Sequence, residues 1–355
     1  MTHLSNTTLI IPAHYRHSYL PGLLKYFSEN SDIKILICDS TDVPFRGDLP
    51  GTCQYFHFPD MSFSKKMFLS LEKVKTAYVL MCADDDLVSP KALYECEQFL
   101  EKNNDYSSAQ GETISFSKNE KGVLCSFPSR LYSLGGEISG ETLVERVKQC
   151  FSHYKDLFYT VYSTEVLRMF FRDIKDLPAG FNGFLIEVAM AFYAIANGKN
   201  KALKTFYSAR EFADKSWAYQ IPNPAALSKS KKGTRDIDLI KNICTKHLLS
   251  KAYKEAEAVL AVDQFFENGV LMFETLSGSI FRRWRSKVFR MVEKLLPNLV
   301  ERVLRKMLRA PSQFELFEQQ VNQVRDLKGF PYGNDDCANE EWEKMKAILS
   351  ERTFL

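Results

Sequence analysis

Three consecutive aspartates, Asp84-Asp85-Asp86, are the residues whose types and spacing most directly suggest chemistry. Adjacent carboxylates repel one another, and they become favourable when a divalent cation is present to hold them. Mg²⁺ or Mn²⁺ binds one or two protein carboxylates and completes its coordination with phosphate oxygens and water. The alternative is a solvated turn before a helix, where the helix dipole favours Asp. The triplet therefore predicts either a metal–diphosphate site, with all three aspartates as candidate ligands, or a polar helix start.

Further polar residues follow two apolar runs that lie earlier in the chain. Asp39 ends the run 33–38, where its carboxylate could accept hydrogen bonds from a ribose or a base. Arg16 follows the run 8–11 and could pair with a phosphate. Each has an ordinary alternative, a turn-capping aspartate or a surface arginine, but together they converge at successive strand ends. The candidate nucleotide-binding residues are Pro12, His14, Arg16, Asp39, Ser40, Lys65 and Asp84.

The order of the apolar patterns predicts how these residues are positioned. Short apolar runs that suit buried strands alternate with segments of helical spacing, and Pro90 begins another helix. The predicted strands are 8–11, 33–38 and 77–82, and the predicted helices between them are 18–28 and 64–74. Such alternation is typical of an α/β fold with a mainly parallel sheet, in which ligands bind beyond the carboxyl ends of the strands. We therefore expect the acidic and basic candidates to share one edge of the sheet.

The second half of the chain has a more helical and more charged pattern. Residues 236–265 suit one or two helices, and residues 313–327 suit another. Pro297 is expected to divide or kink a helical segment further along. We predict two parts, a catalytic α/β domain over 1–222 and a helical region over 223–355.

Composition sets broader limits. The 355 residues are 45% hydrophobic and 26% charged, so a sizeable core can form and whole-chain disorder is excluded. The net charge of +3 does not argue for a nucleic-acid partner. The eight cysteines form no CxxC pair, which disfavours a zinc ribbon, and several lie in apolar runs that suit reduced core thiols. Without a signal-peptide pattern or an apolar stretch of about 18 residues, the expectation is a soluble cytoplasmic protein.

The segment 279–310 is the second strong signal. Between Phe281 and Ala310 it carries ten basic and two acidic residues, a local charge of +8, together with an apolar stripe at helical spacing that includes Trp284. A basic face opposite Trp, Phe and Leu suits an anionic membrane surface, which would make the protein peripheral on the inner face of the cell membrane. The alternative is a core-packed helix with a basic solvent face. RNA is a weaker third option, because the stripe is aliphatic rather than aromatic.

Three motifs together resemble GT-A glycosyltransferases of the family 2 type, over about residues 7–215. They are Leu-Ile-Ile-Pro-Ala-His-Tyr-Arg at 9–16, Ile-Leu-Ile-Cys-Asp-Ser at 35–40 and Tyr-Val-Leu-Met-Cys-Ala-Asp-Asp-Asp-Leu-Val-Ser-Pro at 78–90. The nearest likeness is a bacterial branch whose third strand ends in Cys-Ala-Asp-Asp-Asp. The resemblance implies a GT-A-like fold, a nucleotide-sugar donor and a divalent metal, Mn²⁺ or Mg²⁺. It matches Asp85 best to the metal-binding acid and places Asp84 nearer the ribose, and a literal Asp84-x-Asp86 reading stays open.

A later signature of the family resembles the segment 157–198. An aromatic strand over 157–162 precedes the turn Gly180-Phe-Asn-Gly183, then Glu187 and finally Gly198. By this match Glu187 takes the place of the catalytic base, although Ile186 stands where the family usually has a first acidic residue. Glu187 is also the only charged residue between Phe181 and Ala196, and apolar surroundings would raise its pKa towards neutrality. The alternative is a glutamate on the exposed stripe of an amphipathic helix.

These inferences predict a metal-dependent glycosyltransferase, which inverts the anomeric centre because no second nucleophile is evident. The acceptor would be a glycan or a lipid-linked hydroxyl in bacterial surface polysaccharide synthesis. A nucleotidyltransferase acting on a sugar phosphate is the alternative enzyme, although residues 14–17 lack the glycine-rich loop expected after its first strand. A non-catalytic membrane-surface scaffold is the alternative outside enzymes.

Overall fold

The computed structural model describes residues 1–119, 122–126, 137–152, 157–178, 180–211, 227, 229–276 and 336–351. These residues build one nine-stranded sheet of order β3-β2-β1-β4-β8-β6-β9-β5, with β7 paired to β6. The first four strands in that order are parallel, and β8 joins them to β6 through antiparallel pairs. The strands are β1 Thr7–Ala13, β2 Lys34–Asp39, β3 Cys53–His57, β4 Tyr78–Met81, β5 Leu87–Val88, β6 Tyr106–Asn119, β7 Gly122–Ser126, β8 Val161–Ser163 and β9 Lys199–Glu211.

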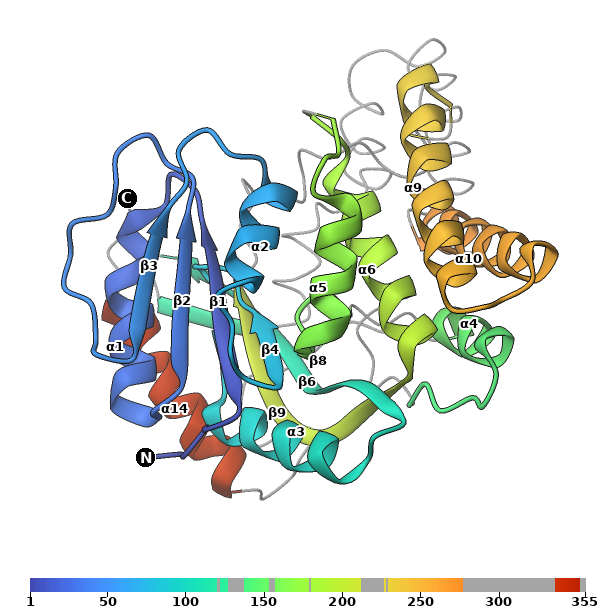
Figure 1. The fold of residues 1–355 in the computed structure, drawn as a ribbon. Coiled ribbons are helices and arrows are strands. Elements are labelled where there is room, and N and C mark those ends of the chain that lie inside the picture. Colours follow the sequence, from blue (N-terminus) through green and yellow to red (C-terminus); the bar gives the residue numbers. More distant parts are fainter. Residues whose placement is uncertain are drawn as a thin grey trace, which may run out of the picture.

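Helices cover both faces of this sheet, as Figure 1 shows. One face carries α1, α3 and α14, and the other carries α2, α5 and α6, with α4, α9 and α10 packed beyond α6. The helices are α1 Leu20–Asn30, α2 Phe63–Leu71, α3 Pro90–Lys102, α4 Leu143–Ser152, α5 Thr164–Ile174, α6 Gly183–Asn197, α9 Lys231–Ser250, α10 Glu255–Leu276 and α14 Asp336–Glu351, preceded at the start by the short 3-10 helix η1 His17–Tyr19.

The continuous apolar runs of the parallel strands follow from this double coverage. Ile10 packs into the core beneath α2, α5 and α6, whereas its neighbours Leu9 and Ile11 pack into the core beneath α1, α3 and α14. A strand buried on both faces needs apolar side chains at successive positions rather than at alternate ones. The α/β fold class and its helical C-terminal part are therefore confirmed.

The first strand is longer than the predicted run 8–11, and Pro12 lies within it. β1 continues to Ala13, and Pro12 pairs with Cys38 of β2. The pairing of β1 with β4 stops at Ile10 and Met81, so the proline lies past the part of β1 that β4 covers. A proline near a strand end costs little because its missing N–H would have few ladder partners there.

The C-terminal helices are only partly where the patterns placed them. The predicted helical stretch 236–265 is two helices, α9 and α10, whereas the segments 279–310 and 313–327 lie outside the described residues. α14 packs against α1, where Lys25 pairs with Glu351 at 2.9 Å and Trp342 is buried. The division at residue 222 stays a prediction.

Two further expectations concern the core and the membrane. Five of the described cysteines, at positions 38, 82, 96, 150 and 244, are buried, as their apolar surroundings predicted. Along the described part of the chain, every helix is too short or too polar to cross a bilayer.

Candidate active site

The topology brings the first and third strands of the sequence pattern side by side. β1 leads through α1 to β2 on one side, whereas β4 returns through α2 to the other side of β1. Open α/β sheets bind ligands beyond the carboxyl ends of the strands at such a reversal of strand order. The segment after β1 carries Arg16, and the segment after β4 carries Asp84 to Asp86, so the acidic and basic candidates meet there.

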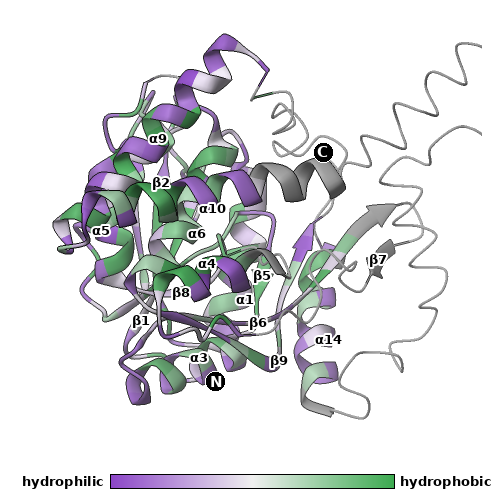
Figure 2. Cartoon of the chain, turned by 90° about the vertical axis from the view of Figure 1, so that its right-hand side faces the viewer, coloured by the Kyte–Doolittle hydropathy of each residue, from purple (hydrophilic) through white to green (hydrophobic). Residues whose placement is uncertain are grey.

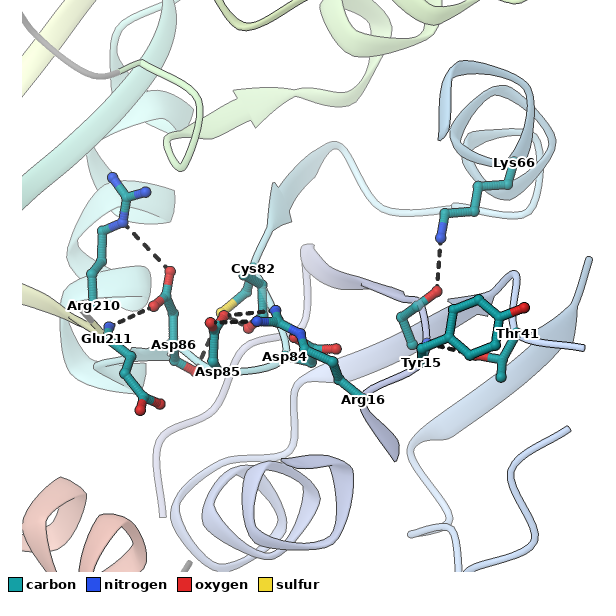
Figure 3. Close-up of polar contacts among 12 residues, drawn as sticks. Tyr15, Arg16, Thr41, Lys66, Cys82, Asp84, Asp85, Asp86, Arg210 and Glu211 are labelled. Carbon is teal, nitrogen blue, oxygen red and sulfur yellow. Dashed lines mark hydrogen bonds and ion pairs between the residues drawn. The ribbon is translucent and has the colours of Figure 1, made fainter. Parts of the chain in front are cut away.

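Arg16 joins two of the three aspartates in one ion-pair cluster (Figure 3). Its Nη1 donates to Asp85 Oδ2 at 2.7 Å and its Nη2 donates to Asp85 Oδ1 at 3.0 Å. The same Nη2 also donates to Asp84 Oδ1. The carboxylates are 1% (Asp84) and 13% (Asp85) exposed, whereas the arginine is 40% exposed. Arg16 therefore lies between the carboxylate pair and the solvent.

Asp86 turns away from that pair and towards β9. Its Oδ1 accepts a hydrogen bond from the backbone N–H of Glu211 at 2.9 Å, and its Oδ2 lies 3.5 Å from Nε of Arg210. The guanidinium of Arg210 in turn lies over the ring of Tyr159, 4.2 Å from its centroid. These contacts hold Asp86 against β9 and so connect the acidic segment to the sheet. The sequence pattern had predicted Asp86, like Asp84 and Asp85, as a candidate metal ligand.

Burial has the largest effect on the pKa values of Asp84 and Asp86. It raises the pKa of Asp84 to about 6, because the Asp85 carboxylate adds to the desolvation and the Arg16 guanidinium offsets only part of it. Burial beside Asp85 also raises the pKa of Asp86 well above its usual value, against the opposing effect of Arg210. Burial thus favours the neutral acid at Asp84 and Asp86, and a cation bound beside them would favour their charged forms.

The residues present fit a metal that the substrate helps to hold. Two carboxylates, Asp84 and Asp85, already converge on one guanidinium nitrogen, and Asp84 Oδ2 is buried without a hydrogen-bond partner. Within the described ranges, no group of three or more His, Cys, Asp or Glu side chains is arranged as a complete metal cage. One or two carboxylates with phosphate oxygens and water are the usual magnesium arrangement.

Asp39 is placed deeper than its predicted role in nucleotide binding suggests. The side chain is 0% exposed, and its oxygens accept from the Thr41 N–H at 2.9 Å, the Tyr55 hydroxyl at 2.6 Å and the His17 ring at 2.7 Å. Burial alone would raise the pKa of Asp39, but these hydrogen bonds outweigh it and hold the pKa below the usual value. As placed, Asp39 holds the side chains of His17 and Tyr55 in position through these hydrogen bonds.

A buried lysine joins the ends of β1 and β2. Lys66 of α2 donates to the Ala13 carbonyl at 2.8 Å and to Ser40 Oγ at 2.9 Å, and Ser40 also contacts His14 Nδ1 at 3.0 Å. Burial lowers the pKa of Lys66. The predicted candidate Lys65 is instead exposed on α2. Lys66 shares the buried face of α2 with Met67 and Leu71, and this helical spacing is the signal that could have selected it over Lys65.

Tyr15 has an unusual backbone at the same edge. Its φ of 56° lies in the left-handed region, its N–H donates to Thr41 Oγ1 at 2.9 Å, and its ring is 60% exposed. Left-handed backbone at a bulky residue carries a conformational cost that tends to be kept where a site needs it. The strained backbone of Tyr15 is therefore a further reason to place the functional site at the carboxyl ends of the strands.

Glu187 comes from another element. It lies in the second turn of α6, whose N-terminus is capped by Asn182 through hydrogen bonds to the N–H groups of Phe184 and Leu185. α6 starts on the side of the sheet where β1, β2 and β3 end (Figure 1), and Figure 2 colours most of it hydrophobic. Glu187 is partly exposed between the buried residues Ile186 and Val188. Its neighbours along α6 are thus apolar and buried, and the role of Glu187 as the base stays a prediction.

A small apolar pocket adjoins that turn of α6. It is lined by Phe184, Leu185, Val188, Leu227, Ile237, Phe266 and Gly269. The lining contains no charged side chain, so it does not extend the ionic cluster at the strand ends.

Comparison with known proteins gives structural similarity only. No protein-family model matches the chain, and no curated protein sequence matches it. Among solved structures, residues 1–349 of S. aureus TarS are similar with a TM-score of 0.48 and 13% identity, over 81% of this chain and 80% of that one. A second structure of that fragment, in complex with UDP-GlcNAc, gives the same TM-score and identity over 82% of each chain. A third, in complex with UDP, has a TM-score of 0.45 and covers 90% of this chain and 91% of that one.

Proposed function

We propose that this chain is a GT-A-type glycosyltransferase that moves a sugar from a nucleotide-sugar donor to a hydroxyl group of a glycan or lipid-linked acceptor, with inversion at the anomeric carbon. The observation that carries the proposal is the meeting of Arg16 with Asp84 and Asp85 at the reversal of strand order. The motif resemblance of residues 7–215 to family 2 glycosyltransferases supplies the sugar.

The charged side chains at this edge of the sheet have different roles in the proposed reaction. Asp84 and Asp85 would hold a divalent cation, Mn²⁺ or Mg²⁺, which neutralises charge on a leaving diphosphate when it is bound. Lys66 fixes the ends of β1 and β2, and Asp39 holds His17 and Tyr55, which would contact the donor. In this arrangement the protein binds and orients the donor from three strand ends at once.

Glu187 would act on the acceptor. Its carboxylate takes the proton of the acceptor hydroxyl as that oxygen bonds to the anomeric carbon, and the bond from this carbon to the diphosphate oxygen breaks with its electron pair. A single displacement of this kind inverts the anomeric centre. Beside the motif match, this role is supported by the place of Glu187 near the start of α6, between the buried residues Ile186 and Val188.

The direct test is a thermal-shift screen of nucleoside diphosphates and nucleotide-sugars with and without Mn²⁺. A ligand that binds only the folded state raises the melting temperature, by more as its concentration exceeds Kd. We expect at least one nucleotide-sugar to stabilise the protein, and to do so more strongly with Mn²⁺. No stabilisation by any purine or pyrimidine nucleotide-sugar would reject the proposal, and turnover of a sugar phosphate with a nucleoside triphosphate would favour the nucleotidyltransferase.

We also propose that the segment 279–310 holds the enzyme at the inner face of an anionic membrane. Its ten basic residues should each contribute about 1 kcal/mol near such a surface, screened by salt. Co-sedimentation with anionic liposomes at low salt is the measurement. Substituting Glu for Arg282, Arg283 and Arg285 should weaken sedimentation mainly at low salt, whereas Trp284→Ala should weaken it at any salt. Wild-type protein that stays in the supernatant would favour a core-packed helix instead.

A further inference from the structure

Arg16 occupies the position in which a cation would meet Asp84 and Asp85. One guanidinium nitrogen contacts an oxygen of each carboxylate, and the other nitrogen completes a two-pronged pair with Asp85. Such bidentate pairs are among the stronger hydrogen-bonded ion pairs. The two acids therefore already have a cation, which the chain itself supplies.

The exposures show which groups a solvent cation reaches first. Arg16 is 40% exposed, while Asp84 and Asp85 are 1% and 13% exposed. Asp84 Oδ1 is taken by Arg16, and Asp84 Oδ2 is buried. A metal ion coming from solvent thus meets a positive guanidinium before it meets the carboxylates, and it can coordinate both of them only if the guanidinium moves.

A second contact offers the guanidinium a place to stay when it moves. Arg16 lies in the short segment between β1 and η1, and its guanidinium carbon is 5.4 Å from the centroid of the Tyr19 ring. Cation–π contacts of this length stabilise an arginine without any carboxylate. The side chain can therefore leave the acids and remain within the site.

We propose that Arg16 is a resident counter-ion for Asp84 and Asp85, which a divalent cation must displace. Arg16 offsets one of the two carboxylate charges in the metal-free protein and lowers the affinity of the pair for the free ion, so that the metal enters with the diphosphate that supplies its remaining ligands. This inference rests on the proposed function for the diphosphate, but the competition between Arg16 and a metal does not need a nucleotide.

The test is a calorimetric titration of the full chain with Mn²⁺ in the absence of nucleotide. Arg16→Gln removes the competing charge, and we expect Mn²⁺ to bind about tenfold more tightly or better than to wild type. Unchanged or weaker binding would overturn the proposal. Adding Asp85→Asn to Arg16→Gln should abolish the gain, and a gain that survives the second substitution would also overturn it, because the ion would then bind elsewhere.

Two matched variants guard against simpler explanations. Arg210→Gln removes an arginine from the same triplet but from Asp86, so we expect it to change Mn²⁺ affinity by less than about threefold. An equal gain in both variants would mean only that the site had become more negative, and would overturn the displacement. Arg16→Lys keeps the charge without the two-pronged geometry and is expected to bind Mn²⁺ with intermediate affinity. If Arg16→Gln does not fold, Arg16→Lys is compared with wild type instead. An Mn²⁺ affinity of Arg16→Lys that is no higher than that of wild type would then overturn the proposal.

The same experiments separate this inference from the proposed function. Tighter Mn²⁺ binding by Arg16→Gln in a protein that binds no nucleotide-sugar would support the counter-ion role and reject the glycosyltransferase. Metal-dependent nucleotide-sugar binding with unchanged Mn²⁺ affinity in Arg16→Gln would do the reverse.

Discussion

Replacing Glu187 with Gln is expected to leave donor binding intact and to reduce sugar transfer by about 10²–10⁴-fold, the usual contribution of a general base. The amide is nearly isosteric with the carboxylate, but it cannot take a proton from the acceptor hydroxyl. The measurement is turnover of the donor found by the nucleotide screen, alongside calorimetric binding of that donor.

A matched control is Glu257→Gln, which makes the same chemical change at an exposed position in the first turn of α10. This variant should transfer sugar at the wild-type rate. Transfer by Glu187→Gln within a few-fold of wild type would place the base elsewhere. Loss of donor binding in Glu187→Gln would indicate instead that the residue supports the donor site.

Asp85→Asn should weaken metal-dependent binding of a nucleoside diphosphate by at least about tenfold, since even residues that only support a metal ligand contribute about 10–100-fold to metal affinity. The fold should be preserved, because Asp85 is partly exposed and the asparagine keeps its size. Calorimetry with Mn²⁺ present and with a chelator present separates the metal-dependent part of the affinity.

Asp238→Asn on the exposed face of α9 is the control for this change in charge, and it should bind as wild type does. Equal affinities of Asp85→Asn and wild type in the presence of Mn²⁺ would remove Asp85 from the metal site. An equal loss with and without Mn²⁺ would point to a direct contact between Asp85 and the nucleotide.

The sequence was most informative where one short run of residues determines both structure and position. The runs 33–38 and 77–82 are continuous and apolar because both faces of these strands are buried, and they closely match β2 and β4. Pro90 begins α3, where the preceding Ser89 caps the helix by accepting from the Ala92 N–H. Local patterns of this kind need no knowledge of the rest of the chain.

The patterns missed what depends on distant residues. β3 was not predicted because Cys53 to His57 are only partly buried at the sheet edge, so the run lacks a clear apolar signature. Arg210 contacts Asp86 across 124 positions of sequence, and spacing cannot reveal such a pair. Asp39 was correctly placed at a strand end. The hydrogen bonds that its carboxylate accepts from Thr41, Tyr55 and His17 depend on β3 and on the segment after β1, which the local pattern does not contain.

The packing of α14 has a consequence for biosynthesis. Its Glu341 accepts a hydrogen bond from the Ser89 hydroxyl at 2.8 Å, and Ser89 caps α3, which begins after the short strand β5 that follows the acidic triplet. All the candidate site residues have been translated long before this helix leaves the ribosome. A nascent chain therefore carries every charged group of the site while one support of its acidic segment is still missing, and it passes through a stage in which Ser89 and the buried Phe206 beneath Trp342 are uncovered.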